Sequence, residues 1–191
     1  MAVCIVDAPE IIRLLADFTR TEILQLLCEH PMTEAQLSKE LGLTRAAVGY
    51  HLNLLLKAEL IYLERTEPEG HGILQKFYSP IAAFFIADCS HIPHDVKRFF
   101  LQMQIMNLRG IFIAFQLHHR FFGVSPATLE KLAATMLRQL EETGRKYAKE
   151  DPVENAEALK VKIYAEALDN LTKQDEWRAL FRGSKNSSRT W

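Results

Sequence analysis

The chain has 191 residues, of which 48% are hydrophobic and 25% are charged, and its formal net charge is −1. This composition is ordinary for a globular protein with a buried core and gives no global attraction for nucleic acid. Three cysteines, Cys4, Cys28 and Cys89, are too few and too dispersed for a disulfide framework, so a reducing, cytoplasmic setting is expected.

No membrane partner and no secretion are expected from the sequence. The first ten residues, MAVCIVDAPE, lack a basic segment ahead of an apolar run and do not look like a secretory signal. The most apolar stretch, from Phe99 to Phe122, is interrupted throughout by polar side chains. It is therefore expected to form a buried helix and not a membrane span.

Two helices are predicted in the first 30 residues. Asp7 and Glu10 stand in the spacing of a capping box and predict a first helix that runs to about Asp17. Thr19 and Glu22 repeat this spacing and predict that a second helix begins almost at once.

Two more short helices follow, joined by a tight turn. Thr33 and Gln36 predict the start of the third helix, and Gly42 predicts its end, because glycine readily adopts the left-handed conformation that terminates helices. Thr44 is placed to cap the fourth helix. Two short helices in this order are typical of a helix-turn-helix.

The pattern then changes from helix to strand. Residues 60–65 (LIYLER) and 73–80 (ILQKFYSP) are rich in branched and aromatic side chains, and the segment between them contains Pro68, Gly70 and Gly72. These segments predict a β-hairpin, which after a helix-turn-helix corresponds to the wing of a winged helix.

Beyond Pro80 the pattern predicts helices. A short apolar segment and three long helices are expected at about 81–88, 95–122, 125–149 and 151–181. Ser125 and Asp151 are placed to start the last two helices. Residues 183–191 are mostly small and polar and are expected to form a flexible tail.

One face of the fourth helix suits a DNA major groove. At about 100° per residue, Val48, Leu52 and Leu55 fall on one side and are expected to face the core. The opposite side offers groups that read bases or reach phosphates, because arginine pairs with guanine and asparagine with adenine. The candidate contacts on this helix are Thr44, Arg45, Ala46, Gly49, Tyr50, Asn53 and Lys57.

Two segments resemble the ArsR-like family of transcriptional regulators. The stretch LLADFTRTEILQLL, residues 14–27, resembles that family's run through its second helix. The stretch LTRAAVGYHLNLLLKAELI, residues 43–61, resembles its recognition helix and the start of its wing. The resemblance, which extends over about residues 9–80, implies binding to double-stranded DNA as a homodimer, repression or activation of transcription, and often control by a metal or another effector.

The chain departs from the family pattern at three places. Gly49 occupies a position where the family often has a phosphate-binding serine, and Glu59 replaces the glycine that usually ends the recognition helix. The third helix, TEAQLSKEL, lacks the paired cysteines of the metal-sensing members, so that sensing mechanism is not expected here.

The wing carries acidic residues where a DNA-binding wing would favour basic ones. Glu67 and Glu69 lie near its tip, and only Arg65, His71 and Lys76 are expected to reach the DNA backbone. Seven Lys and Arg residues against ten Asp and Glu residues between positions 9 and 79 leave a net charge of −3. Nonspecific affinity for DNA is therefore expected to be weak.

Two features beyond the wing suggest alternatives. Cys89, His91 and His94 form a Cys-x-His-x-x-His cluster that would need a fourth ligand to hold zinc or copper, and a plain loop is the favoured interpretation. Eight phenylalanines are expected to pack in a core or a dimer interface rather than to line an effector pocket: Phe84, Phe85, Phe99, Phe100, Phe112, Phe115, Phe121 and Phe122.

The sequence thus predicts a mainly α protein with an N-terminal winged helix-turn-helix, a two-stranded wing and an all-helical C-terminal dimerisation region. The expected divisions are 1–80, 81–182 and 183–191. The predicted function is that of a homodimeric regulator on a pseudo-palindromic operator, without a cofactor or enzymatic signature motif. The alternatives are a protein-binding winged helix within a larger assembly, and a sensor of a metal or an unidentified small-molecule effector with its site in the helical half.

Overall fold

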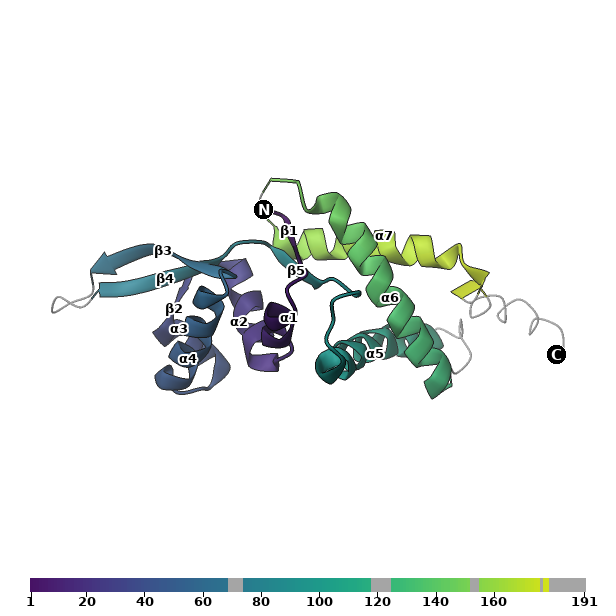
Figure 1. Cartoon of the computed structure of the whole chain (residues 1–191), viewed down its shortest axis with the longest axis horizontal. Helices are drawn as coiled ribbons and strands as arrows, with labels where there is room; N and C mark the ends of the chain where they lie inside the picture. Colours follow the sequence, from purple (N-terminus) through teal and green to yellow (C-terminus); the bar gives the residue numbers. More distant parts are fainter. Residues whose placement is uncertain (69–73, 118–124, 152–154, 176, 179–191) are drawn as a thin grey trace.

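The chain is drawn out along one axis, with a β-hairpin at one end and three long helices at the other (Figure 1). This computed structural model describes residues 1–68, 74–117, 125–151, 155–175 and 177–178. Within that part it has seven helices and five strands. In chain order they are β1 (Val3–Val6), α1 (Pro9–Leu15), α2 (Phe18–Glu29), β2 (Met32–Thr33), α3 (Glu34–Leu41), α4 (Arg45–Lys57), β3 (Ile61–Pro68), β4 (Leu74–Pro80), β5 (Phe84–Ala87), α5 (His94–Leu117), α6 (Pro126–Tyr147) and α7 (Ala156–Thr172). The prediction of a mainly helical protein with an N-terminal helix-turn-helix and a small antiparallel wing is confirmed.

Helix α1 begins differently from the prediction. Its N-cap is Ala8, which makes no side-chain hydrogen bond, so the predicted capping box of Asp7 and Glu10 is wrong. Asp7 directly follows strand β1, and the helix starts instead at Pro9, whose fixed backbone angle suits the first helical position.

The junction between α1 and α2 also differs. Helix α1 ends at Leu15, and Asp17 caps α2 by accepting a hydrogen bond from the backbone N–H of Arg20 at 2.9 Å. Thr19, the predicted cap, therefore lies inside α2. Asp17 is the stronger N-cap of the two and comes first along the chain, so the helix starts two residues earlier than predicted.

The helix-turn-helix forms as predicted. Thr33 and Gln36 form a capping box. The Thr33 hydroxyl oxygen accepts from the backbone N–H of Gln36 at 3.2 Å, and Oε1 of Gln36 accepts from the backbone N–H of Thr33 at 2.8 Å. Gly42 ends α3 with a φ of 64°, and Thr44 caps α4 by accepting from the backbone N–H of Ala47 at 3.2 Å. These local hydrogen bonds fix where α4, the recognition helix, begins.

The predicted hairpin is present, and it belongs to a three-stranded antiparallel sheet in the order β2-β4-β3. The outer strand β2 consists of Met32 and Thr33, which pair with Tyr78 and Phe77 of β4. The sequence did not indicate β2, because two residues are too few for an alternating pattern. Residues 69–73, which include Glu69 and the candidate contact His71, lie outside the described residues.

A second, parallel pair joins β1 to β5, with Val3 opposite Phe84 and Val6 opposite Ala87. The expectation of helix in residues 81–88 is therefore wrong for Phe84–Ala87. A four-residue apolar run does not distinguish strand from helix by itself. Its partner strand lies about 80 residues earlier in the chain, so only the tertiary fold decides between them.

Two clusters of buried side chains meet at this strand pair. The first packs the winged helix and includes Ile23, Leu37, Val48, Leu52 and Leu55. The second packs α5, α6 and α7 and includes Leu108, Met136, Ile163, Leu171 and Trp177. Strand β1 contributes to both, because Val3 lies in the second cluster and Val6 in the first.

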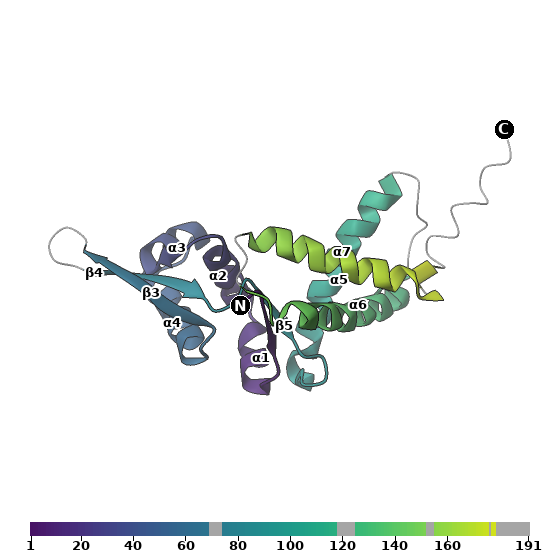
Figure 2. The same ribbon diagram turned by 90° about the horizontal axis from the view of Figure 1, so that it is seen from above.

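The C-terminal helices pack across one another, with α6 in contact with both α5 and α7 (Figure 2). Ser125 caps α6 as predicted. The cap of α7 is Asn155, not Asp151, and it accepts from the backbone N–H of Ala158 at 2.9 Å. Helix α7 ends at Thr172, so the expectation that it continues to about residue 181 is wrong. The predicted helix end at 122 and the tail 183–191 lie outside the described residues.

The end of α4 contains a residue in a strained backbone conformation. The N–H groups of Glu59 and Leu60 donate to the carbonyl oxygens of Leu56 and Leu55, each at 3.0 Å, which is the Schellman pattern. This pattern places Glu59 in the left-handed region, with a φ of 55°, at a position that favours glycine.

Glu59→Gly is expected to raise the free energy of unfolding by about 0.5 to 1 kcal/mol, because the relieved strain exceeds the added freedom of the unfolded chain. Chemical denaturation measures this difference. Gly42→Ala is the matched control with the opposite sign, since Gly42 has a φ of 64° and no heavy atom lies within 4 Å of an added Cβ. A Glu59→Gly variant no more stable than the parent would contradict the expected strain.

Candidate nucleic-acid interface

The recognition helix α4 has the two faces that its sequence predicts. Val48, Leu52 and Leu55 are buried in the core of the winged helix. The opposite face is open: Tyr50 is 61% exposed, and Asn53 and Lys57 are also exposed. The groups expected to meet bases or phosphates therefore lie together on the solvent side of one rigid helix.

The N-terminus of α4 adds a second set of donors. Thr44, Arg45 and Ala46 are all exposed in the first turn, where backbone N–H groups lack intrahelical partners. The partial positive charge of a helix N-terminus favours phosphate. The Thr44 oxygen accepts from Ala47, which leaves its hydroxyl hydrogen able to donate to a DNA phosphate.

Gly49 lies at the contact between α3 and α4. It is half-buried, and a Cβ added there would lie 3.0 Å from Oε2 of Glu34. The missing side chain thus makes room for a carboxylate of α3 beside the recognition helix. This contact gives a packing reason for glycine at the position where the ArsR-like pattern often has serine.

The wing holds its arginine in internal contacts. The Arg65 side chain bonds to Glu67 at 2.7 Å and to Glu64 at 2.8 Å, and its guanidinium lies 4.1 Å from the centre of the Phe77 ring. The hydrogen bond to Glu67, together with the contact to Glu64, raises the pKa of Arg65 above its ordinary value. A DNA phosphate would therefore compete with two carboxylates for this side chain.

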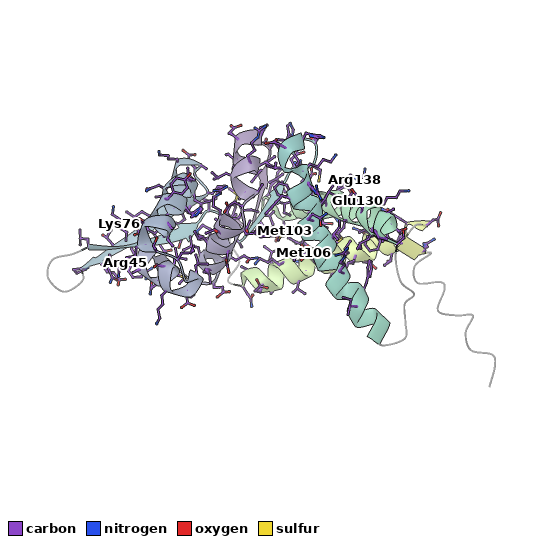
Figure 3. All side chains as sticks on the ribbon, turned by 90° about the horizontal axis from the view of Figure 1, so that it is seen from below. Arg45, Lys76, Met103, Met106, Glu130 and Arg138 are labelled. Atoms are coloured by element: carbon purple, nitrogen blue, oxygen red, sulfur yellow. The ribbon has the colours of Figure 1, made fainter. Side chains whose placement is uncertain are left out.

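The other basic residue described on the wing is less restricted. Lys76 on β4 is exposed and, within the described part of the chain, forms no ion pair. Figure 3 shows Lys76 and Arg45 at the same end of the molecule, which places a wing cation at the end that carries the recognition helix.

Most of the basic side chains of the winged helix are free of ion pairs with described residues. Arg13 pairs with Asp95 at 3.0 Å and Arg20 with Asp17 at 3.6 Å, so neither is a free cation. Four cations form no ion pair with any described residue: Lys39, Arg45, Lys57 and Lys76. The sequence analysis missed Lys39, an exposed residue of α3, because its lack of a partner is visible only in the fold.

The loop with the Cys-x-His-x-x-His cluster is organised around a carboxylate. Asp88 accepts hydrogen bonds from Ser90 and lies 2.7 Å from Arg145 and 3.2 Å from His91. The Ser90 hydrogen bonds, more than the nearby His91, lower the pKa of Asp88 to about 2.

Cys89 in this loop contacts a different carboxylate. Its backbone N–H donates to Glu141 at 2.8 Å, and burial raises the pKa of its thiol to about 12. Cys89, His91 and His94 are not brought together, and the described residues contain no group of three His, Cys, Asp or Glu side chains arranged for a metal. His91 instead lies against Asp88.

The helix-turn-helix matches a known family. Residues 17–62 match the family described as bacterial regulatory protein, arsR family. The match begins at the N-cap of α2 and ends in β3, so it covers the helix-turn-helix and the start of the wing. No curated protein matches the chain. In the part of the chain that the structure describes, none of the helices is long and apolar enough to cross a membrane.

Proposed function

We propose that this chain, whose residues 17–62 match the family described as bacterial regulatory protein, arsR family, is a transcriptional regulator that acts as a homodimer on specific double-stranded DNA sites in the cytoplasm. The single observation that carries the proposal is the solvent face of α4. It presents Arg45, Tyr50 and Asn53 on a helix whose other face is fixed in the core.

The chemistry of that face supports direct reading of bases. The Arg45 guanidinium is exposed and makes no ion pair with any described residue, so both of its terminal nitrogens can pair with O6 and N7 of one guanine. The Asn53 amide can pair with adenine in the same groove. Thr44, Lys57 and Lys76 are suited to the flanking phosphates, which position the protein without specifying sequence.

A homodimer would place two copies of α4 in successive major grooves of a pseudo-palindromic operator. The C-terminal helices offer a surface for this association. Met106 and Ile113 on α5 are 62% and 56% exposed and stand seven residues apart, so they lie on one face of the helix. Large apolar side chains exposed along one helix face are typical of an interface.

The test is selection of binding sites from a random double-stranded DNA pool, followed by a gel-shift titration of the selected site at low and moderate salt. We expect enrichment of a site with two-fold symmetry and a stoichiometry of two chains per site. A pool that shows no enrichment at low salt would contradict sequence-specific binding.

The acidic wing favours a second candidate function, that of a winged helix that binds another protein. Arg65 is held by Glu64 and Glu67, and residues 9–79 carry a net charge of −3. In this case no DNA would be retained even at low salt, because nonspecific binding depends on neutralising phosphates. The same low-salt titration therefore separates the two functions.

Glu67→Gln is expected to strengthen DNA binding by about two- to fivefold at low salt, because it releases one carboxylate from Arg65 and removes a negative charge from the wing. The slope of log affinity against log salt concentration should also become steeper, by about the amount expected for one further phosphate contact per chain. Fluorescence anisotropy with a labelled duplex measures both.

Glu130→Gln is the matched control for this wing variant. It makes the same change in charge on α6, away from the end that carries Arg45 and Lys76 (Figure 3). An equal gain in both variants would mean that net charge, and not release of Arg65, controls affinity.

A further inference from the structure

A carboxylate of α3 lies directly beside the recognition helix. Glu34 is the first residue of α3, and a Cβ added to Gly49 of α4 would lie only 3.0 Å from its Oε2 atom. Helices α3 and α4 pack against each other, and both lie at the hairpin end of the molecule (Figure 1). The space that a side chain would fill at position 49 is therefore occupied by this carboxylate.

The Glu34 carboxylate has acceptor capacity that the described part of the protein does not use. Glu34 forms no hydrogen bond and no ion pair with any described residue. The side chain is half-buried, but its oxygens are not among the fully buried polar atoms that lack a partner, so a donor from outside can reach them. Burial and, second, the negative charge of Glu34 raise the pKa of the neighbouring Tyr78 phenol.

The carboxylate lies at the edge of the face of α4 that is expected to meet DNA. At about 100° per residue, Gly49 falls between Leu52 on the core face and Asn53 on the open face. Arg45 lies one turn earlier on the same side of the helix. In a helix-turn-helix, the second helix enters the major groove while the first crosses the DNA backbone. A side chain between the two helices is thus close to the base edges.

DNA offers few donors to a carboxylate. The phosphates are acceptors and repel a negative charge. In the major groove, guanine and thymine also present acceptors, whereas cytosine presents the donor N4 amino group. Adenine has an amino group too, but its N7 acceptor lies beside it. Cytosine is therefore the base whose edge best fits an unpaired carboxylate.

We propose that Glu34 is a specificity-determining residue that accepts a hydrogen bond from N4 of a cytosine in the operator, and that Gly49 positions it by leaving space beside α4. Gly49 lies about 6 Å along the helix axis from Arg45, so this cytosine is expected within about two base pairs of the guanine paired with Arg45. The inference rests on the proposed function, because it concerns how the operator is read.

Selection from a random double-stranded pool, run in parallel with the parent chain and Glu34→Gln, tests the base preference. We expect the parent to enrich a C·G pair at this distance from the guanine. Glu34→Gln should lose that preference and accept A·T there, because a glutamine amide pairs with N6 and N7 of adenine. An unchanged preference in the variant would overturn the inference and leave the proposed function standing. No enrichment by either protein would overturn both.

Removal of the amino group from the DNA tests the hydrogen bond itself. The selected cytosine is replaced by 2-pyrimidinone, which is cytosine without its 4-amino group, and binding is measured by fluorescence anisotropy. The parent should bind this duplex about five- to tenfold more weakly than the unmodified one. Glu34→Ala should bind the two duplexes nearly equally, because it has no acceptor at this place. An equal loss for both proteins would overturn the inference.

Gly49→Ala tests the positioning of the carboxylate. The added Cβ would displace the end of the flexible Glu34 side chain. The preference for cytosine should fall about as far as in Glu34→Ala, and combining the two substitutions should reduce it no further. Additive losses would mean that position 49 acts independently of Glu34, and would overturn the positioning role of Gly49.

Glu40→Gln is the matched control for Glu34→Gln. Glu40 is an exposed residue of the same helix, forms no hydrogen bond or ion pair with described residues, and undergoes the same change in charge. This control should leave the base preference unchanged. An equal gain in affinity for every duplex in both variants would mean that Glu34 only repels phosphate.

A purely structural role of Glu34 would give a different result. A carboxylate in the first turn of α3 is favoured by the partial positive charge of the helix N-terminus. If that were its only role, Glu34→Gln would lower the free energy of unfolding, measured by chemical denaturation, without changing the base preference. Either this result or a uniform gain in affinity would overturn the inference, whereas a change confined to one base pair would support it.

Discussion

Arg45→Ala is expected to abolish specific operator binding. The exposed guanidinium on the first turn of α4 would lose two hydrogen bonds to one guanine, which corresponds to about 1 to 3 kcal/mol for each half-site. Because a symmetric operator has two half-sites, the dimer loses this binding free energy twice. A gel-shift titration of the selected operator measures it, and affinity for unrelated DNA should fall far less.

Two control variants separate base reading from charge. Arg45→Lys keeps the positive charge but cannot form the bidentate pair of hydrogen bonds with guanine. It should therefore retain nonspecific DNA binding and lose the preference for guanine at one base pair. Arg138→Ala removes a cation from α6, away from the recognition helix (Figure 3), and should bind the operator normally. Operator binding by Arg45→Ala equal to that of the parent would rule out the proposed placement of α4.

Met106→Glu combined with Ile113→Glu is expected to dissociate the homodimer and weaken operator binding by at least about 100-fold. The two carboxylates would be buried against apolar surface in a dimer built on this face of α5, at a cost that association cannot offset. A monomer would also lose the gain from holding two half-sites at once. Sedimentation velocity and a gel-shift titration measure these two effects.

Val161→Glu is the matched control for this interface. It adds one carboxylate at a 66% exposed apolar position of α7 and should leave the dimer intact. These point variants are preferable to a cut after Pro80, because β5 would be removed from its pairing with β1. A double variant that remains dimeric would move the interface away from this face of α5.

The sequence determined the helix-turn-helix because its signals are local. The capping box of Thr33 and Gln36, the left-handed Gly42 and the Thr44 cap all act within four residues. The core face of α4 follows from helical periodicity alone. Chain order and spacing then sufficed to predict the winged helix and to identify the candidate contacts on its recognition helix.

Where two local signals competed, the predicted helix boundary was wrong. Asp17 and Thr19 both suit an N-cap, and the aspartate prevails as the stronger and earlier of the two. Asp151 likewise looked like the start of the last helix, but Asn155 caps it. Capping motifs predict that a helix starts nearby, while the exact residue depends on which side chain the fold leaves free to bond.

Only the tertiary structure decided the features that join distant segments. Strands β1 and β5 are too short to show a period, and each is stabilised by a partner about 80 residues away. The contact of Glu34 with Gly49 depends on how α3 and α4 approach each other. A cavity of about 510 Å³ is lined by residues of six elements, α1, α2, β5, α5, α6 and α7, and it exists only when all six are in place. Hydrogen bonds and burial between remote segments produce no local pattern in the sequence. Helix caps and amphipathic faces do produce one, because the residues that form them are close together in the chain.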